Sequence, residues 1–301
     1  MNTGAAPRSI EQYLKALRDC LAGEDPSLLQ DALYDAEEYL RAELNANPGK
    51  SEADVLEIIA STYGAPDEVA DAYRTTEQQV RAALAPPKRK EHKSAIGRFF
   101  GVYGDSRAWT ALFYMLLALG TGIVYCTVTV TGLAMSAGLA VLIVGIPFFL
   151  LFVGFTRVLA LAEGRLVEGL LGERMPRRPH YPQKGKPFME RIKEMLTDRR
   201  TWTTMLYFLL MLPLGVIYFT LAVTALALSV GLMVSPFLEL VSETGGLYVD
   251  GVYMTPEPMA AIVAIPLGIL LLTIMLHLFR GIGTMHGGLA KHLLVAQSGS
   301  D

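Results

Sequence analysis

The sequence predicts an all-α membrane protein in which a small helical bundle precedes four membrane-spanning helices, with a short β-hairpin between the last two spans. The 301-residue chain is 52% hydrophobic and only 18% charged, whereas a soluble domain carries about 25% charged residues. Residues 108–156 contain no charged residue at all, although about 20 apolar residues already cross a bilayer. A single soluble domain and a disordered chain are therefore excluded. A disulfide scaffold is excluded as well, because the chain has only 2 cysteines.

Residues 1–85 are predicted to form an acidic helical domain, which we call the head. They hold 7 Lys and Arg against 16 Asp and Glu, a net charge of −9. Apolar residues recur at helical spacing, Ser51-Glu-Ala-Asp54 is a capping pattern that opens a third helix, and Pro66 begins a fourth. Nucleic-acid binding needs a basic face, so the charge favours a protein partner. The acidic residues of the predicted partner-binding surface are Asp35, Glu37, Glu38, Asp67 and Glu68.

The apolar tracts divide into four predicted spans, at about 108–131, 137–159, 203–229 and 258–279. The spans are organised into two membrane repeats, each with a trailing interfacial helix. The complete order is a basic juxtamembrane linker at 86–107, the first repeat at 108–175, a basic linker at 176–200 and the second repeat at 201–301.

The distribution of Lys and Arg predicts the orientation. Residues 86–107 carry a net charge of +4 and residues 157–200 a net of +5, whereas residues 230–257 have no Lys or Arg. The positive-inside rule then places both termini and the middle loop in the cytoplasm. The basic segments are expected to contact the bilayer, with anionic lipids among the candidates. The basic juxtamembrane residues that we single out are Arg174, Arg177, Arg178, Arg199 and Arg200.

The link between the last two spans, residues 230–257, is predicted to form an external cap. Asp250-Gly251 stands between two apolar triplets, which is the strongest short signal for a β-hairpin turn. The cap either closes the helix pair or senses a ligand or partner, and the sequence leaves both open.

An internal repeat relates the two halves of the membrane region. Asp105-Ser-Arg-Ala-Trp109 matches Asp198-Arg-Arg-Thr-Trp202 at an offset of 93 residues. Because each copy has two spans, the copies share one orientation. Proline inside a span removes a backbone donor and kinks the helix, so the paired prolines predict matched bends in spans two and four. The repeat signature consists of Trp109, Tyr114, Trp202, Tyr207, Pro147 and Pro266.

The head resembles the HAAS signalling domain of bacterial membrane proteins. The resembling elements are Tyr13-Leu14-x-x-Leu17, Asp35-Ala-Glu37-Glu38-Tyr39 and Tyr63-Gly64-Ala-Pro66-Asp67-Glu68-Val69-Ala70. The membrane part is similar to the bacterial "putative sensor" transmembrane domain in its Trp-Thr-x-x-x-Tyr motif, its Ile-Pro pair and the helix around Gly164. The resemblance implies signalling through protein interaction and no catalytic residues. This chain departs from it in carrying two sensor-like copies and a long insertion.

Chemistry-bearing motifs are absent from the sequence. There is no Gly-rich phosphate loop, HExxH or GxSxG, so we predict no enzyme, no catalytic residue, no cofactor and no metal site. His277 is interpreted as a membrane-interface histidine, with His286 and His292 in the cytoplasmic tail. Glu163, Glu168 and Glu173 alternate with arginines and are interpreted as the solvent-exposed face of an interfacial helix.

Three functions remain open from the sequence. The favoured one is a signalling or regulatory protein of the inner membrane, whose head binds a cytoplasmic or membrane protein. The second is a non-catalytic subunit or scaffold of a transporter-associated membrane complex. The third is a lipid-handling carrier that uses a groove between the repeats. Small residues in the spans permit close helix contact within one chain or between chains, so the oligomeric state stays open.

Overall fold

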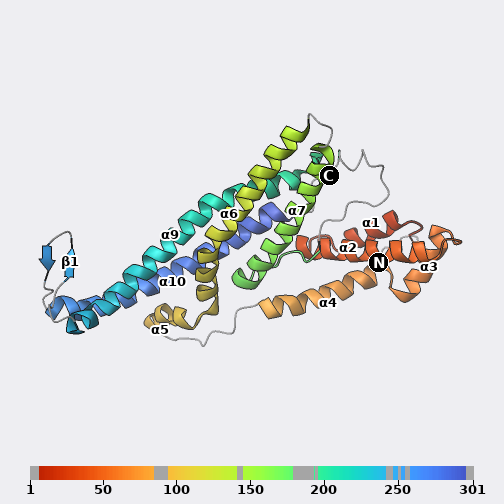
Figure 1. Ribbon diagram of the computed structural model, residues 1–301. Helices are drawn as coiled ribbons and strands as arrows, with labels where there is room; N and C mark the ends of the chain where they lie inside the picture. Colours follow the sequence, from red (N-terminus) through yellow and green to blue (C-terminus); the bar gives the residue numbers. More distant parts are fainter. Residues whose placement is uncertain are drawn as a thin grey trace. The chain divides into compact units, whose positions relative to one another are not determined.

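The computed structural model confirms the all-α fold class (Figure 1). It describes residues 7–84, 94–140, 145–178, 193, 196–241, 247–249, 252–254 and 258–295. The chain divides into two compact units. The first comprises Met1–Ala85, Gly132–Leu206 and Leu289–Asp301, and the second comprises Pro86–Thr131 and Tyr207–Gly288.

The head, in the first unit, contains four helices: α1 (Ile10–Cys20), α2 (Pro26–Ala46), α3 (Glu52–Thr62) and α4 (Pro66–Leu84). The predicted capping box is present, since Ser51 and Asp54 exchange side-chain and backbone hydrogen bonds at the start of α3. Gly64 adopts φ +111° between α3 and α4, a conformation that favours glycine. The Tyr13 hydroxyl donates to the Gly64 carbonyl at 2.8 Å and fixes this turn against α1.

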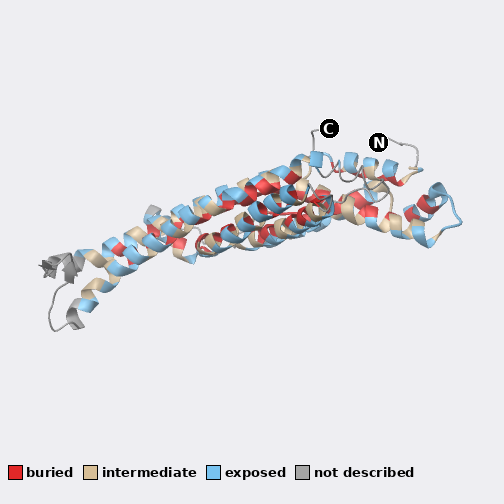
Figure 2. Ribbon diagram, turned by 45° about the horizontal axis from the view of Figure 1, so that its top comes forward, coloured by how far each residue is buried: buried red, intermediate tan, exposed pale blue. Residues whose placement is uncertain are grey.

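Apolar side chains from all four helices form the core of the head. Leu17 and Leu40 are fully buried, and Ile59 and Ala70 join them from α3 and α4. Figure 2 shows that burial follows one face of each of these helices while the other face is exposed. This is the amphipathic pattern that a small bundle requires, because each helix has only one apolar stripe to bury.

Four long helices carry the apolar tracts: α6 (Ser106–Ala140), α7 (Gly145–Leu166), α9 (Arg199–Val241) and α10 (Pro258–Leu294). Among the described residues, four helical stretches are long and apolar enough to cross a membrane. They are Ser106–Ala140, Gly145–Leu171, Arg199–Leu238 and Val263–Leu294. A short helix α5 (Ala95–Phe100) and a 3₁₀ turn η1 (Gly101–Gly104) precede α6, and a π-helical turn η2 (Val167–Leu171) follows α7.

The long helices extend beyond the predicted spans. The expected interfacial helix after span four is continuous with α10, and α7 passes directly into η2. The hydrocarbon region limits how many residues must be apolar, but it does not end a helix. Likewise α9 runs to Val241, so the first half of the predicted cap is helical.

The predicted β-hairpin is present as two short strands. Strand β1 (Leu247–Val249) pairs with β2 (Val252–Met254) in an antiparallel register that places Val249 opposite Val252. The expected turn residues, Asp250 and Gly251, lie outside the described residues.

The expectation of matched proline kinks is wrong. Pro266 is the ninth residue of α10, but Pro147 is the third residue of α7. Backbone N–H groups in the first turn of a helix have no intrahelical acceptor, so proline is tolerated there without a bend. The two Ile-Pro pairs therefore occupy different positions in their helices.

In the second unit, α6 and α9 cross in close backbone contact at two glycines. A Cβ on Gly122 would lie 2.5 Å from the Met211 carbonyl oxygen, and a Cβ on Gly215 would meet the Ala118 carbonyl oxygen equally closely. The repeat offset of 93 residues relates Gly122 to Gly215 and Ala118 to Met211. The crossing is thus reciprocal between the two repeats and requires glycine in both.

We expect Gly122→Ala to destabilise the membrane region. The added methyl group meets a backbone carbonyl that cannot rotate away, and overpacking of this kind costs about 1–3 kcal/mol. The matched control is Gly120→Ala, because a Cβ at Gly120 meets nothing within 4 Å. Thermal unfolding of the detergent-purified chain measures both variants. Equal melting temperatures for the two alanine variants would contradict the close crossing.

Candidate functional site

In the first unit, the head contacts the segment that follows η2. Gly172, at φ +73°, ends η2, and the chain then reaches Arg174, whose side chain is 9% exposed. Arg174 Nη2 lies 2.9 Å from Asp31 Oδ2 of α2, and Arg174 Nε lies 3.1 Å from Glu77 Oε2 of α4. Its Nη1 also donates to the Met175 carbonyl. One buried guanidinium therefore joins two head helices to this segment.

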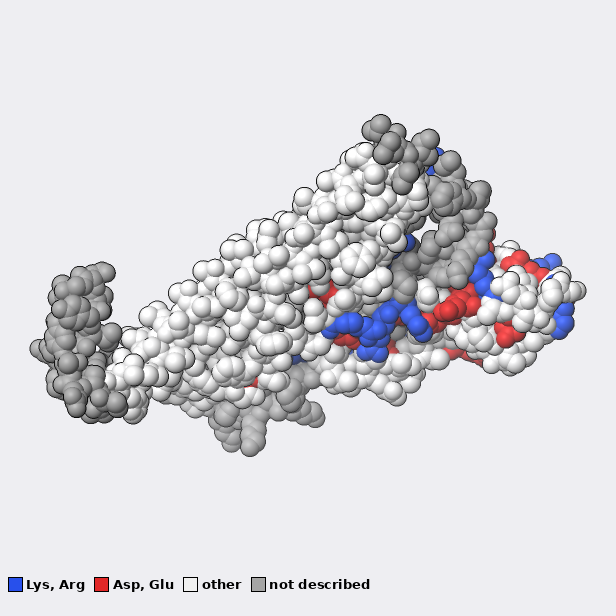
Figure 3. Space-filling model, in the orientation of Figure 1, with Lys and Arg blue, Asp and Glu red and all other residues white. Residues whose placement is uncertain are grey.

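Further contacts surround Arg174 and its two buried carboxylates. The backbone N–H groups of Arg177 and Arg178 each donate to Asp31 Oδ1 at 2.8 Å. The Arg178 guanidinium pairs with Asp35 at 2.7 Å and lies 5.7 Å from the centre of the Tyr34 ring. Figure 3 shows blue and red atoms side by side here, whereas the long helices are almost entirely white. The Arg174 network, as we call it, comprises Asp31, Asp35, Glu77, Arg174, Arg177 and Arg178.

Burial sets the electrostatics of the Arg174 network. It raises the pKa of the Asp31 carboxyl above its ordinary value, outweighing the hydrogen bonds from Arg174 and from the backbone of Arg178 and Arg177. Burial also lowers the pKa of Arg174, but the hydrogen bonds and charges of Asp31 and Glu77 reverse this, and the net pKa is raised. Arg174 therefore stays charged, and Asp31 depends on its donors to remain ionised.

Two more polar links tie α2 to the same unit. Lys291 Nζ, near the end of α10, lies 2.7 Å from Asp25 Oδ2 and 3.0 Å from Glu173 Oε1. Burial by itself raises the pKa of Asp25, but the hydrogen bond and charge of Lys291 and the Ser27 N–H outweigh it and lower the pKa. Gln30 donates to the Arg178 carbonyl at 2.5 Å and accepts from Arg200 Nη1 at 2.8 Å.

The structure brings together only part of the predicted acidic surface. Asp35 belongs to the Arg174 network, and it also accepts a hydrogen bond from Tyr73 at 3.0 Å. Glu37 is 6% exposed and pairs with Arg41 of its own helix at 2.9 Å. The exposed residues of the set are Glu38, Asp67 and Glu68.

The basic set is similarly divided. Arg174, Arg177 and Arg178 enter the Arg174 network, and Arg200 donates to Gln30 and to the Leu294 carbonyl. Arg199 is exposed. Lys184, Lys186 and Arg191, which contribute to the basic linker, lie outside the described residues.

The sequence analysis missed Asp31 and Glu77, the two carboxylates that hold Arg174. Asp31 is 7% exposed and lies beside Ala32 on the core-facing side of α2. A signal was available, because a carboxylate at the edge of an apolar helical stripe must find a cation or a set of donors. The partner itself lies 143 residues away in sequence, and no local pattern identifies it.

The prediction of a solvent-exposed face at Glu163, Glu168 and Glu173 is wrong for the first two. Glu163 is 0% exposed and Glu168 is 7% exposed. Glu168 Oε1 pairs with the Arg177 guanidinium at 2.9 Å. The segment after η2 covers this face of α7, as the approach of Met175 to Gly164 also indicates.

In the second unit, a buried histidine lies within hydrogen-bond distance of tyrosines from both repeats. His286 is 1% exposed, and its Nε2 lies 2.6 Å from the Tyr114 hydroxyl and 3.0 Å from the Tyr207 hydroxyl. Tyr218 reaches the Nδ1 atom at 3.3 Å. The hydroxyls of the signature residues Tyr114 and Tyr207 thus both contact the buried imidazole ring of His286. His286 was expected in a cytoplasmic tail, and the structure places it in α10, inside a helical stretch of 32 residues that is long and apolar enough to cross a membrane.

The two signature tryptophans make equivalent contacts. Trp109 Nε1 donates to the Tyr103 carbonyl at 3.0 Å, and Trp202 Nε1 donates to the Leu196 carbonyl at 2.8 Å. Each accepting carbonyl stands six residues before its tryptophan. Trp109 is 41% exposed and Trp202 is 48% exposed, which suits residues that sit at a membrane interface.

Each repeat also supplies the carboxylate that pairs with an arginine of the other repeat. Arg280 lies 3.2 Å from Asp105 in the second unit, and Arg157 lies 3.6 Å from Asp198 in the first. Asp105 and Asp198 begin the two copies, while Arg157 and Arg280 are separated by the 123-residue offset that relates Gly164 to Gly287. His277, near Arg280, donates from Nε2 to the Phe99 carbonyl at 2.9 Å.

Within the described part of the chain, no group of three or more His, Cys, Asp or Glu residues is arranged to hold a metal ion. The polar side chains described above form ion pairs and hydrogen bonds that join helices.

The four apolar helices define a polytopic helical membrane protein. Residues 114–294, more than half of the chain, match the family model described as "Putative sensor", and the chain belongs to this family. No curated protein and no solved structure matches the chain. The family match leaves the head outside it, so the HAAS resemblance of residues 1–85 stays a prediction.

Removing the buried arginine is expected to release the head from the segment after η2. Arg174→Ala leaves Asp31 and Glu77 buried without their cation, which costs about 3–5 kcal/mol. Arg178→Ala removes a side chain that is 50% exposed, and exposed pairs are worth about 0.2–1 kcal/mol. Hydrogen exchange of the backbone amides of residues 174–178 measures the difference. Equal protection in the two variants would contradict the central role of Arg174.

Proposed function

We propose that this protein transmits a signal across a bacterial inner membrane by controlling whether its acidic head is bound to its own basic segment or to a protein partner. In this proposal both termini are cytoplasmic and the membrane helices sense a membrane or envelope signal. Membership of the "Putative sensor" family supports the sensing part. The Arg174 network is the observation that carries the rest, because it occupies acidic residues of the head within the protein itself.

The Arg174 network has the composition expected of a reversible contact. Arg174 and its two carboxylates are buried and make breaking the contact costly. The Arg178 pair with Asp35 involves a cation that is 50% exposed, so solvent and salt weaken it. A signal that moves η2 or the segment after it changes the balance between bound and released head.

Charge complementarity suggests what the released head binds. The head carries a net charge of −9, and the Arg174 network neutralises Asp31, Asp35 and Glu77 in the bound form. Release returns these carboxylates to solvent beside the exposed Glu38, Asp67 and Glu68. A protein with a Lys- or Arg-rich surface competes for the same carboxylates, which makes binding to the segment and binding to the partner mutually exclusive.

Chemical crosslinking in native membranes, followed by mass spectrometry, tests the proposal. We expect the triple variant Arg174→Gln, Arg177→Gln, Arg178→Gln to capture a cytoplasmic protein several-fold more than the unaltered chain does. Arg199→Gln is the matched control, because Arg199 is exposed and lies outside the Arg174 network. The same protein should be lost when residues 1–85 are deleted. Capture that is unchanged in the triple variant, or that persists without the head, would overturn the proposal.

A further inference from the structure

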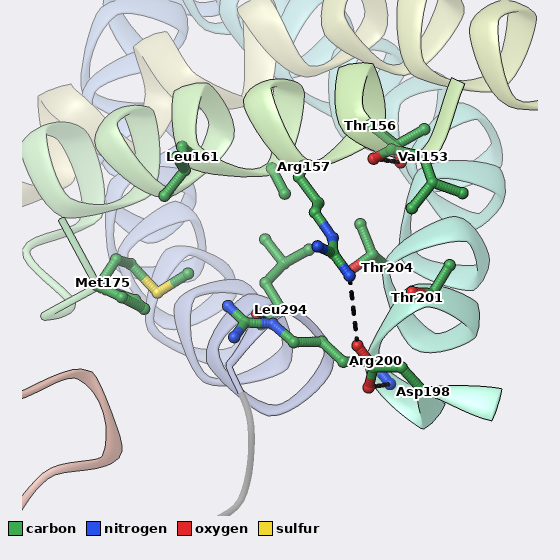
Figure 4. Close-up of a pocket in the computed structure, with 13 residues that line it drawn as sticks. Val153, Thr156, Arg157, Leu161, Met175, Asp198, Arg200, Thr201, Thr204 and Leu294 are labelled. Carbon is green, nitrogen blue, oxygen red and sulfur yellow. Dashed lines mark hydrogen bonds and ion pairs between the residues drawn. The ribbon is translucent and has the colours of Figure 1, made fainter. Parts of the chain in front are cut away.

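A small cavity in the first unit lies between α7, the segment after η2, the first turn of α9 and the end of α10 (Figure 4). Its volume is about 40 Å³, and a water molecule needs roughly 10–15 Å³ measured in this way. The cavity therefore has room for a compact group of a few heavy atoms. A larger molecule can place only one end in it.

The cavity has an excess of positive charge. Arg157 and Arg200 both line it, together with Asp198, and Figure 4 shows Arg157 reaching towards Asp198 while the Arg200 guanidinium lies by Leu294. Arg157 pairs with Asp198 at 3.6 Å, a long and therefore weak contact. Arg200 donates to neutral oxygens, at 3.0 Å to the Leu294 carbonyl and at 2.8 Å to the Gln30 amide. Two cations thus face one carboxylate.

A buried hydroxyl completes the polar side of the cavity. Thr201 is 6% exposed and lines the cavity. Its Oγ1 has no hydrogen-bond partner among the residues that the structure describes. Leaving a buried hydroxyl unpaired is costly, so a buried hydroxyl that lines the same cavity as two arginines indicates that a further oxygen atom belongs there.

The remaining wall of the cavity is mostly apolar, although Thr156 and Thr204 also line it. Val153, Leu161 and Met175 contribute to it. Arg157 is the first charged residue after the uncharged stretch 108–156, and Asp198 and Arg200 directly precede the next apolar stretch. The cavity therefore lies where two spans leave the hydrocarbon region, which is the depth of lipid headgroups.

We propose that this cavity binds the phosphate group of an anionic phospholipid. In the bound form the phosphate oxygens accept hydrogen bonds from Arg157 and Arg200, and the Thr201 hydroxyl donates to a third oxygen. The acyl chains lie against the apolar surface of α7 and α9. Basic pockets between membrane helices recognise phospholipid headgroups in this way. This ligand is additional to the protein partner proposed for the head, although Arg200 also donates to Gln30 of the head.

The repeat provides an internal comparison. Arg280 pairs with Asp105 in the second unit as Arg157 pairs with Asp198 in the first. The 93-residue offset places Ala108 at the position equivalent to Thr201, so the second unit lacks this hydroxyl. Arg280→Gln therefore removes an equivalent ion pair without touching the cavity.

The test uses the full chain in detergent, with native mass spectrometry of added phosphatidylglycerol or phosphatidylcholine. We expect one phosphatidylglycerol molecule to bind in preference to phosphatidylcholine. Arg157→Gln should weaken it about fivefold, since one cation near a headgroup is worth about 1 kcal/mol. Thr201→Val should weaken it as well and keeps the test valid if the arginine variant fails to fold. Arg280→Gln should bind as the unaltered chain does, and millimolar inorganic phosphate should not displace the lipid.

Three results would overturn the proposal. Equal binding of the two lipids would show that this chain does not recognise the net negative charge that distinguishes phosphatidylglycerol from phosphatidylcholine. Equal loss in Arg157→Gln and Arg280→Gln would show that the arginines act through stability rather than through the cavity. Displacement by inorganic phosphate, together with no lipid preference, would assign the cavity to a soluble anion instead.

Discussion

The burial of Arg174 between Asp31 and Glu77 is the interaction on which the arrangement of the first unit depends. A guanidinium in that environment must be paired on several sides at once, since an uncompensated buried charge costs several kcal/mol. Three parts of the chain that are far apart in sequence, α2, α4 and the segment after η2, are held together by that requirement. The surrounding pair of Arg178 with Asp35 is more exposed, and exposed ion pairs contribute little to stability.

A second constraint acts within the membrane region, where backbone and side-chain polar groups must find partners inside the protein. The two repeats meet this constraint because polar groups of one copy pair with polar groups of the other. The carboxylate that begins each copy pairs with the arginine near the end of the other copy's second span, and the two glycines approach each other's helices reciprocally. His286 receives Tyr114 from one copy and Tyr207 from the other.

Two features depart from this symmetry, the segment that contacts the head and the residue at position 201, and both belong to our proposals. The first copy continues into the segment that binds the head, whereas the second copy continues as α10 to Leu294. Position 201 is a threonine where the first copy has Ala108. A duplicated structural frame can therefore carry a head contact and a candidate ligand cavity on one side only.

The sequence by itself determined the fold class, the four apolar helices, the hairpin strands, the capping box of α3 and the family resemblance of the membrane region. These features follow from local composition and periodicity, which act over a few residues. Only the tertiary structure decided which charges pair. Glu163 and Glu168 looked exposed from their spacing, and His286 looked like part of a tail, yet all three are buried. The physical reason is that burial of a charged or polar side chain depends on what covers it, and here the cover comes from segments far away along the chain.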